Sequence, residues 1–168
     1  KVGYPLYENT DVVFYKEAAD GFRAQIEEMK KAQKFIFMEY HAIEDREAFA
    51  EMKAVLFAKA KEGVEIRIVY DDVGSVGFIS PEFVKQMKTH GIDCRIFNPM
   101  MPVLNIFMNN RDHRKITVID GRVGFTGGYN LANEYFNITH PYGVWKDSGV
   151  RLEGEAVRSL TLIFMEMW

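Results

Sequence analysis

A histidine and a lysine two positions apart, His113 and Lys115, carry the clearest chemistry in this chain. They lie in the run His-Arg-Lys-Ile-Thr-Val-Ile-Asp, which is typical of a β-strand. Because side chains alternate between the two faces of a strand, His113, Lys115 and Thr117 are expected on one face and Arg114 on the other. An imidazole can attack an electrophile or exchange a proton, and a neighbouring ammonium can hold an anionic oxygen.

A glycine-rich segment, Gly-Gly-Tyr-Asn at 127–130, follows this run. The pair Asp120-Gly121 is a tight-turn signal, so the segments on either side of it are expected to form a hairpin. A hairpin brings its two ends together, which places the asparagine and the glycine amides near His113. Imidazole, ammonium, carboxamide and open amides together suit an anion, and a phosphate best of all. Asp120 lies at an odd offset from His113, so it is expected to point away from it, in an orienting or structural role.

The rest of the chain alternates segments with strand and helix patterns. Apolar residues at helical spacing, such as Phe49, Met52 and Leu56, predict helices, and Asp45 is a candidate N-cap. Strand–helix alternation with one hairpin predicts an α/β domain, with a mixed β-sheet flanked by helices on both faces. The segments 98–111 and 128–144 are expected to be irregular. Strands are expected over 11–15, 34–41, 64–71, 92–97, 113–120, 122–127 and 145–154, and helices over 20–33, 45–62, 81–90 and 155–168.

The length and composition of the chain limit the classes of protein to which it can belong. The chain has 168 residues, of which 48% are hydrophobic and 27% charged, so residues 1–168 are expected to form a single domain with its own core. A net charge of −3 argues against a protein that coats nucleic acid. The single cysteine, Cys94, rules out an internal disulfide. No apolar run is long enough to span a membrane. A first residue of Lys1 suggests a piece of a longer protein.

His113, Lys115 and Asp120 have the spacing H-x-K-x(4)-D, followed by G-G-x-N, and so resemble the phospholipase D superfamily. With further matches outside this motif, the chain resembles the first catalytic half of a bacterial cardiolipin synthase from about residue 11 to its end. Two departures are Asp112 and Lys146, where the family more often has asparagine and arginine. The further matches are Glu39-Tyr40, Gly63-Val64, Tyr70-Asp71, Gly74-Ser75, the run 109–120, Trp145-Lys146-Asp147 and the segment 164–168.

The resemblance implies catalysis without a metal or any other cofactor. One histidine attacks phosphorus to give a phosphohistidine, a second histidine protonates the leaving alcohol, and an acceptor alcohol reverses the step. On this basis the catalytic residues are His113, Lys115 and Asp120, with His113 as either the nucleophile or its acid/base partner. The phosphate-binding residues are Lys115, Gly128 and Asn130.

The resemblance also implies a carboxylate that orients the imidazole of His113. Asp147 is the expected residue, with Glu134 as the second choice. The family's site needs two motifs, and this chain carries one, so the second half is absent from it. The other histidines are not followed two positions later by lysine and are expected to be ordinary surface or loop residues: His41, His90 and His140.

The implied function is a phosphatidyltransferase that joins two phosphatidylglycerol molecules and releases glycerol, with this chain supplying half of the active site. The expected partners are the phospholipid substrate, a second phospholipase D-like half or a second copy of the chain, and a membrane surface, but no nucleic acid. The full-length protein is expected at the cell membrane with its catalytic domain on the cytoplasmic side, and this piece is expected to be soluble.

Two alternatives stay open. One is a phosphodiesterase or nuclease with a single motif that acts as a homodimer. The other is a catalytically silent module that binds lipid or a partner protein.

Overall fold

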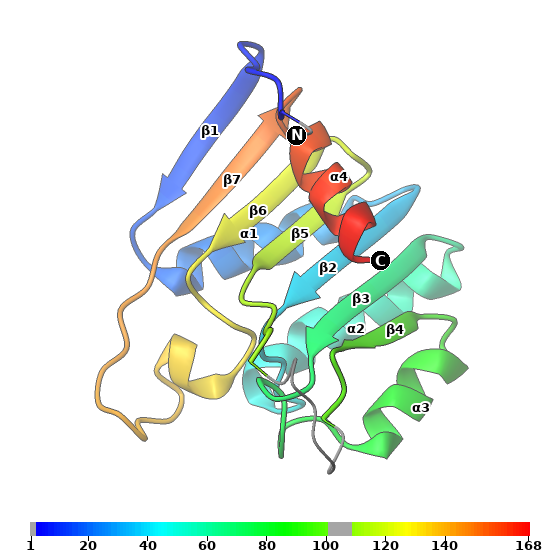
Figure 1. The fold of residues 1–168 in the computed structure, drawn as a ribbon, viewed down its shortest axis with the longest axis vertical. Helices are drawn as coiled ribbons and strands as arrows, with labels where there is room; N and C mark the ends of the chain where they lie inside the picture. Colours follow the sequence, from blue (N-terminus) through cyan, green and yellow to red (C-terminus); the bar gives the residue numbers. More distant parts are fainter. Residues whose placement is uncertain (1–2, 101–108) are drawn as a thin grey trace.

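The computed structural model describes residues 3–100 and 109–168. Within these residues, seven strands form one mixed sheet in the order β1-β7-β6-β5-β2-β3-β4 (Figure 1). The pairs β2–β3 and β3–β4 are parallel, and the other pairs are antiparallel. The strands are β1 Thr10–Tyr15, β2 Phe35–Tyr40, β3 Glu65–Asp71, β4 Asp93–Phe97, β5 Lys115–Ile119, β6 Val123–Gly127 and β7 Gly149–Gly154.

Helices cover both faces of this sheet, as the sequence predicts (Figure 1). On one face, Ile26, Met52 and Phe83 of three different helices share a large core with the sheet. On the other face, Phe164 packs with Phe37 in a smaller core. The α/β architecture with a mixed sheet is therefore confirmed. The helices of the first face are α1 Ala18–Lys30, α2 Glu47–Lys61 and α3 Pro81–Thr89, and that of the second face is α4 Val157–Met167.

The predicted alternation along β5 holds in the structure. Ile116 and Val118 belong to the core under α4. Thr117 faces α1, where its Oγ1 accepts a hydrogen bond of 2.7 Å from Nε2 of Gln25. The same amide group also donates to the hydroxyl of Tyr40, at 2.9 Å. These buried polar groups satisfy one another, which ties α1 to the strands that lead into the site.

The helix starts agree with the sequence in one case and differ in another. Ser80 caps α3, because its hydroxyl accepts a hydrogen bond of 3.2 Å from the amide of Phe83. The predicted N-cap of α2, Asp45, is wrong: the N-cap is Arg46, and its side chain makes no capping bond. Asp45 instead pairs with Lys53, one of the basic residues of α2.

The segment predicted as loop after β6 contains a short 3₁₀ helix, η1 Asn133–Phe136. The side chain of Asn137 then brackets Trp145, accepting from its amide at 2.7 Å and donating to its carbonyl at 2.9 Å. These bonds occupy the backbone of Trp145, so β7 begins at Gly149 rather than at residue 145. Most of the predicted irregular segment 98–111 lies outside the described residues.

The first strand of the chain, β1, lies at one edge of the sheet. It pairs with β7, with Thr10 opposite Gly154. Two apolar side chains of this edge strand are exposed, Val12 at 59% and Phe14 at 61%. None of the helices in the described part of the chain has the length and apolar character needed to cross a bilayer.

Candidate active site

His113 lies two residues before β5, at the end of the sheet where β2 and β3 finish. The register explains its surroundings, because Tyr40, the last residue of β2, lies opposite Lys115 on one side and Tyr70 on the other. The residues that follow, His41 and Asp71, are thereby brought to the segment that carries His113. The carboxyl ends of adjacent parallel strands are a common place for ligand sites.

The ring of His41 packs against the ring of His113. Their centroids are 4.9 Å apart and the ring planes make an angle of 55°. Nδ1 of His41 lies 2.7 Å from the backbone carbonyl oxygen of Asp112. A carbonyl can only accept, so Nδ1 carries the hydrogen. His41 lies in a loop, as expected, directly after β2, and strand pairing places it beside His113.

Asp71 anchors the segment that leads to His113. This carboxylate is fully buried and accepts hydrogen bonds from the amides of Asp112, at 2.9 Å, and Gly74, at 3.0 Å. Nη1 of Arg111 lies 3.3 Å from it as an ion pair. Its Oδ1 is 4.0 Å from Nδ1 of His41. A buried carboxylate without these donors would cost much free energy, so Asp71 holds the backbone of Asp112 and Gly74 in place.

Lys115 is buried, and its ammonium folds back towards His113. Nζ donates a hydrogen bond of 2.8 Å to the backbone carbonyl of His113. Burial lowers the pKa of Lys115, whereas the carboxylates of Asp112 and Asp147 act in the opposite direction. An ammonium has three donors, so two remain for an anionic ligand.

The environment favours the neutral form of His113. The ammonium of Lys115 is the main cause that lowers the pKa of His113, followed by burial and by His41. Asp112 and Asp71 oppose this effect. A neutral imidazole has the free electron pair that a nucleophile needs.

A buried carboxyl pair, Glu39 and Asp112, lies on the opposite face of β2 from the Tyr40 side chain. Nε of Arg114 is 2.6 Å from Oε1 of Glu39 and 3.4 Å from Oδ1 of Asp112. Despite this ion pair, neither Glu39 oxygen nor Oδ2 of Asp112 accepts a well-directed hydrogen bond. Burial and the nearby Asp112 raise the pKa of Glu39 to about 8, against the effect of Arg114. The Glu39 carboxyl therefore keeps its proton to a higher pH than a free glutamate does.

Asp120 is placed at the opposite end of β5 from His113. It occupies the turn of the β5–β6 hairpin at φ 55°. Its carboxylate accepts hydrogen bonds from the amides of Gln33, Lys34 and Phe35, at 2.9, 2.8 and 2.9 Å. Burial acts to raise the pKa of Asp120, but these amides outweigh it and the pKa is lowered. Seven residues of extended chain span about 20 Å, so the structure does not bring Asp120 to His113.

The predicted phosphate ligands Gly128 and Asn130 lie near the His113 end of β5, but some of their hydrogen-bonding groups already have partners within the protein. The amide of Gly128 donates to the carbonyl of Ser148 at 3.2 Å. Oδ1 of Asn130 accepts from the amide of Ala42 at 3.1 Å, and its Nδ2 donates to the hydroxyl of Tyr135 at 2.7 Å. The carboxamide retains one N–H. Of the three predicted ligands, Lys115 thus keeps the most donors.

Asp147 packs against Gly128 rather than bonding to His113. A Cβ added at Gly128 would lie 2.1 Å from Oδ1 of Asp147, so a larger residue there would displace this carboxylate. The same oxygen accepts from the amide of Ser148 at 2.8 Å. Among the described residues, no hydrogen bond joins Asp147 to the His113 imidazole. Its role as the orienting carboxylate stays a prediction, as does that of Glu134 in η1.

His41 could have been found from the sequence by one signal. It stands directly after a buried strand, as Asp71 ends the next one, and the carboxyl ends of parallel neighbours meet at one edge. The pairing of β2 with β5, which brings His113 to the same edge, is not visible in either segment alone.

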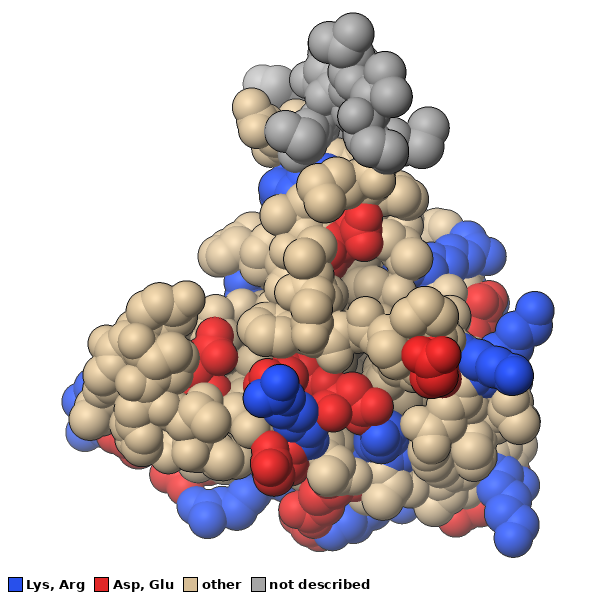
Figure 2. All heavy atoms as spheres, turned by 90° about the horizontal axis from the view of Figure 1, so that it is seen from below, with Lys and Arg blue, Asp and Glu red and all other residues tan. Residues whose placement is uncertain are grey.

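The end of the sheet beyond β2 and β3 is seen in Figure 2, where acidic side chains gather near the middle and basic ones lie beside and around them. No three histidine, cysteine or acidic side chains of the described residues are placed to share a metal ion.

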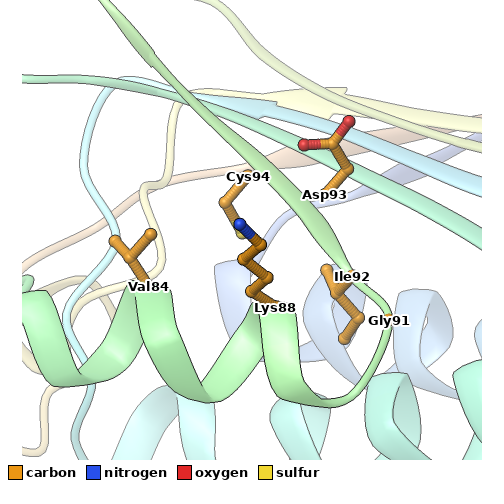
Figure 3. A pocket seen from close by; sticks show the side chains of 6 residues that line it. All are labelled: Val84, Lys88, Gly91, Ile92, Asp93 and Cys94. Carbon is orange, nitrogen blue, oxygen red and sulfur yellow. The ribbon is translucent and has the colours of Figure 1, made fainter.

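A pocket of about 440 Å³ lies away from this site, between α3 and β4 (Figure 3). Its polar lining comes from Lys88, Asp93 and Cys94. Burial raises the pKa of the Cys94 thiol to about 12, with a smaller contribution from Asp93. The thiol is therefore protonated at neutral pH and a poor nucleophile.

Solved structures support the fold. NucT from Helicobacter pylori superimposes with a TM-score of 0.71 at 10% identity, covering 95% of this chain and 96% of that one. Nuc from Salmonella typhimurium, a phospholipase D family member, gives a TM-score of 0.69 at 18% identity, covering 95% and 93%.

Curated relatives are closer in sequence. Cardiolipin synthase 2 of Bacillus cereus is 42% identical over 148 residues, covering 88% of this chain and 29% of the relative. A cardiolipin synthase of Geobacillus is 36% identical over 165 residues, covering 98% and 33%. The chain therefore spans about a third of the length of the curated relatives that it matches. Residues 25–168 match the family model described as "Cardiolipin synthase, PLD-like domain", and the chain belongs to this family.

Proposed function

We propose that the chain forms half of the active site of a phosphatidyltransferase of the cardiolipin synthase type. The observation that carries the proposal is the placement of His113 beside Lys115, with the pKa of the imidazole lowered by that ammonium. The pair supplies a neutral nucleophile and a cation for phosphoryl oxygens. Family membership supports the choice of a phospholipid as the substrate.

The proposed reaction is a double displacement at phosphorus. An imidazole nitrogen of His113 attacks the phosphorus of one phosphatidylglycerol, the bond to the glycerol headgroup breaks, and glycerol leaves with a proton from an acid. A hydroxyl of a second phosphatidylglycerol then attacks the phosphohistidine, and its proton returns to the acid. The products are one cardiolipin and one glycerol. Lys115 and Asn130 bind the phosphoryl oxygens, and the network around the turn at Asp120 holds β5 in place.

The acid must lie opposite the nucleophile, because attack and departure at phosphorus are roughly in line. We assign it to the histidine of a second motif, in another half of the protein or in a second copy of the chain. A second half fits the share of its relatives that the chain covers. The exposed position of His113 leaves it accessible to such a partner.

A homodimeric phosphodiesterase is the second candidate. It is favoured by one observation: the chain covers 96% and 93% of two solved chains with this fold, so a single such domain can be a whole chain. The mixed charge at the site end does not help it to bind nucleic acid.

The test compares the chain alone with a longer protein in which it is joined to the proposed second half. Each is incubated with phosphatidylglycerol vesicles, and glycerol release and cardiolipin are measured, with His113→Ala as the inactive control. We expect transfer by the longer protein, an acid-labile phosphohistidine at His113, and little or no turnover by a monomer of the chain. If the chain is a dimer by analytical ultracentrifugation and cleaves a nucleic acid, the second candidate is favoured. Binding of lipid without any His113-dependent turnover would favour a silent module.

A further inference from the structure

His41 is held on three sides next to the proposed nucleophile. Its Nδ1 donates to the carbonyl of Asp112 at 2.7 Å, and its ring lies against that of His113. On the third side, a Cβ added at Gly74 would lie 2.2 Å from the His41 carbonyl oxygen and 2.7 Å from Cε1 and Nε2 of the ring. Only a hydrogen at position 74 leaves room for this ring position.

The anchor fixes the tautomer of His41. With the hydrogen on Nδ1, the free electron pair of the neutral ring lies on Nε2. Protonation there creates a positive charge beside the His113 ring. The two rings are in contact, so this charge acts on His113 with little intervening solvent.

The geometry excludes His41 as the in-line acid for the leaving alcohol. Attacking and leaving groups lie on opposite sides of phosphorus, so nucleophile and acid must be separated by the phosphoryl group. Rings with centroids 4.9 Å apart leave no space for that group between them. The contact between the two rings places His41 to act on the reaction through His113.

We propose that His41 is a positioning residue: its ring, anchored on the Asp112 carbonyl, holds the His113 imidazole in place and couples the protonation of the two rings. The inference rests on the proposed role of His113 as the reacting histidine. Other charged groups also face His113, and they are Lys115 from β5, Asp112 from the preceding segment and Asp71 from β3, which itself pairs with Arg111.

The charge of His41 acts in the same direction as that of Lys115. It is the third cause that lowers the pKa of His113, after Lys115 and burial. Removal of His41 should therefore raise the pKa of His113. His41→Asn is the cleanest change, because the carboxamide can still donate to the Asp112 carbonyl but carries no charge.

The first measurement needs no enzyme activity. The chain has four histidines, so their ring signals can be followed by NMR in a pH titration, with His113 assigned from His113→Ala. We expect the midpoint of His113 to move to higher pH in His41→Asn. The matched control is His90→Asn, since His90 stacks on Phe57 and is far from the site; it should leave the His113 midpoint unchanged. An unchanged midpoint in His41→Asn overturns the proposal. If that variant is not folded, His41→Gln is read by the same criterion.

The second measurement uses the transfer reaction of the longer protein. The acid limb of the kcat/KM profile reports a group of the free enzyme, here His113. In His41→Asn we expect this limb to move to higher pH and the plateau to fall about tenfold, since misplacement of a reacting group is costly. A purely structural role would lower the plateau without moving the limb. If the wild type shows no His113-dependent transfer, the proposed function fails, and the NMR result still decides the role of His41.

Discussion

Lys115 donates a hydrogen bond of 2.8 Å from Nζ to the backbone carbonyl of His113. The ammonium group of Lys115 is therefore bound to the backbone of the same residue, His113, whose imidazole pKa it lowers. In the proposed reaction, the two remaining donors of the ammonium bind the phosphate. Lys115 thus holds the segment before β5 in place, and the proposed reaction gives it a second role, the binding of an anion.

Lys115→Ala should weaken the binding of inorganic phosphate or sulfate to the chain by about tenfold, because a charge-assisted hydrogen bond is lost. NMR titration of the backbone amides with phosphate measures the affinity. Lys85→Ala, which removes an exposed lysine of α3, is the control and should bind as the wild type does. Equal affinity in Lys115→Ala would contradict the assignment.

Glu39→Gln should flatten the dependence of stability on pH. The pKa of Glu39 is raised from 4.5 to about 8, so the folded state keeps a proton that the unfolded chain releases. This contribution is fully present below pH 4.5 and is lost as the pH rises towards 8, so the wild type should lose stability over that interval. Glutamine cannot ionise and should lose less.

Urea unfolding at pH 5 and pH 8 measures this difference. Glu8→Gln, a change at an exposed carboxylate, should show the slope of the wild type. Parallel slopes for the wild type and Glu39→Gln would mean that Arg114 keeps Glu39 ionised in the fold.

Asp120→Ala should destabilise the chain by about 3 kcal/mol, because three backbone amides lose a charged acceptor and alanine is disfavoured at φ 55°. Asp120→Asn should cost less, since asparagine tolerates that backbone conformation and keeps one acceptor oxygen. Chemical denaturation ranks the two. In the transfer assay, Asp120→Asn should retain the activity per folded molecule. A loss comparable to that of His113→Ala would instead place Asp120 in the chemistry.

Gly74→Ala should lower stability by about 1–3 kcal/mol, because the new methyl group overlaps the backbone and ring of His41. The change adds no charge, yet it should also shift the ring signals of His41 and His113. Thermal unfolding and NMR record both effects. Gly3→Ala, where nothing lies within 4 Å, is the neutral reference. Unaltered ring signals would show that the loop moves rather than His41.

The local patterns of the sequence predict much of the fold and the central pair of the site. Alternation predicts that Ile116 and Val118 share one face of the strand and Thr117 faces the other way, because period-two burial is a property of the segment itself. The structure confirms this and places the first face against α4 and the second against α1. Ser80 before Pro81 marks the start of α3 for an equally local reason. Asp45 fails as a cap because its carboxylate has a competing partner, Lys53.

The missing parts of the prediction depend on contacts between distant segments. His41 is an ordinary histidine in its own segment and becomes part of the site only through the pairing of β2 with β5. The hydrogen bonds that Asp120 accepts come from residues 33–35, more than 80 positions away. The periodicity of a single segment does not predict these contacts, because they depend on which strands pair and in which register.

The pairing of β1 with β7 has a consequence for how the protein is made. Thr10 leaves the ribosome well before its partner Gly154, so β1 has no edge to join until β7 has been made. At about 5–20 residues per second this wait is on the order of ten seconds. During it, Val12 and Phe14 belong to an unpaired nascent strand that can associate with other chains. The first of the seven strands to be made is therefore the last to find its partner.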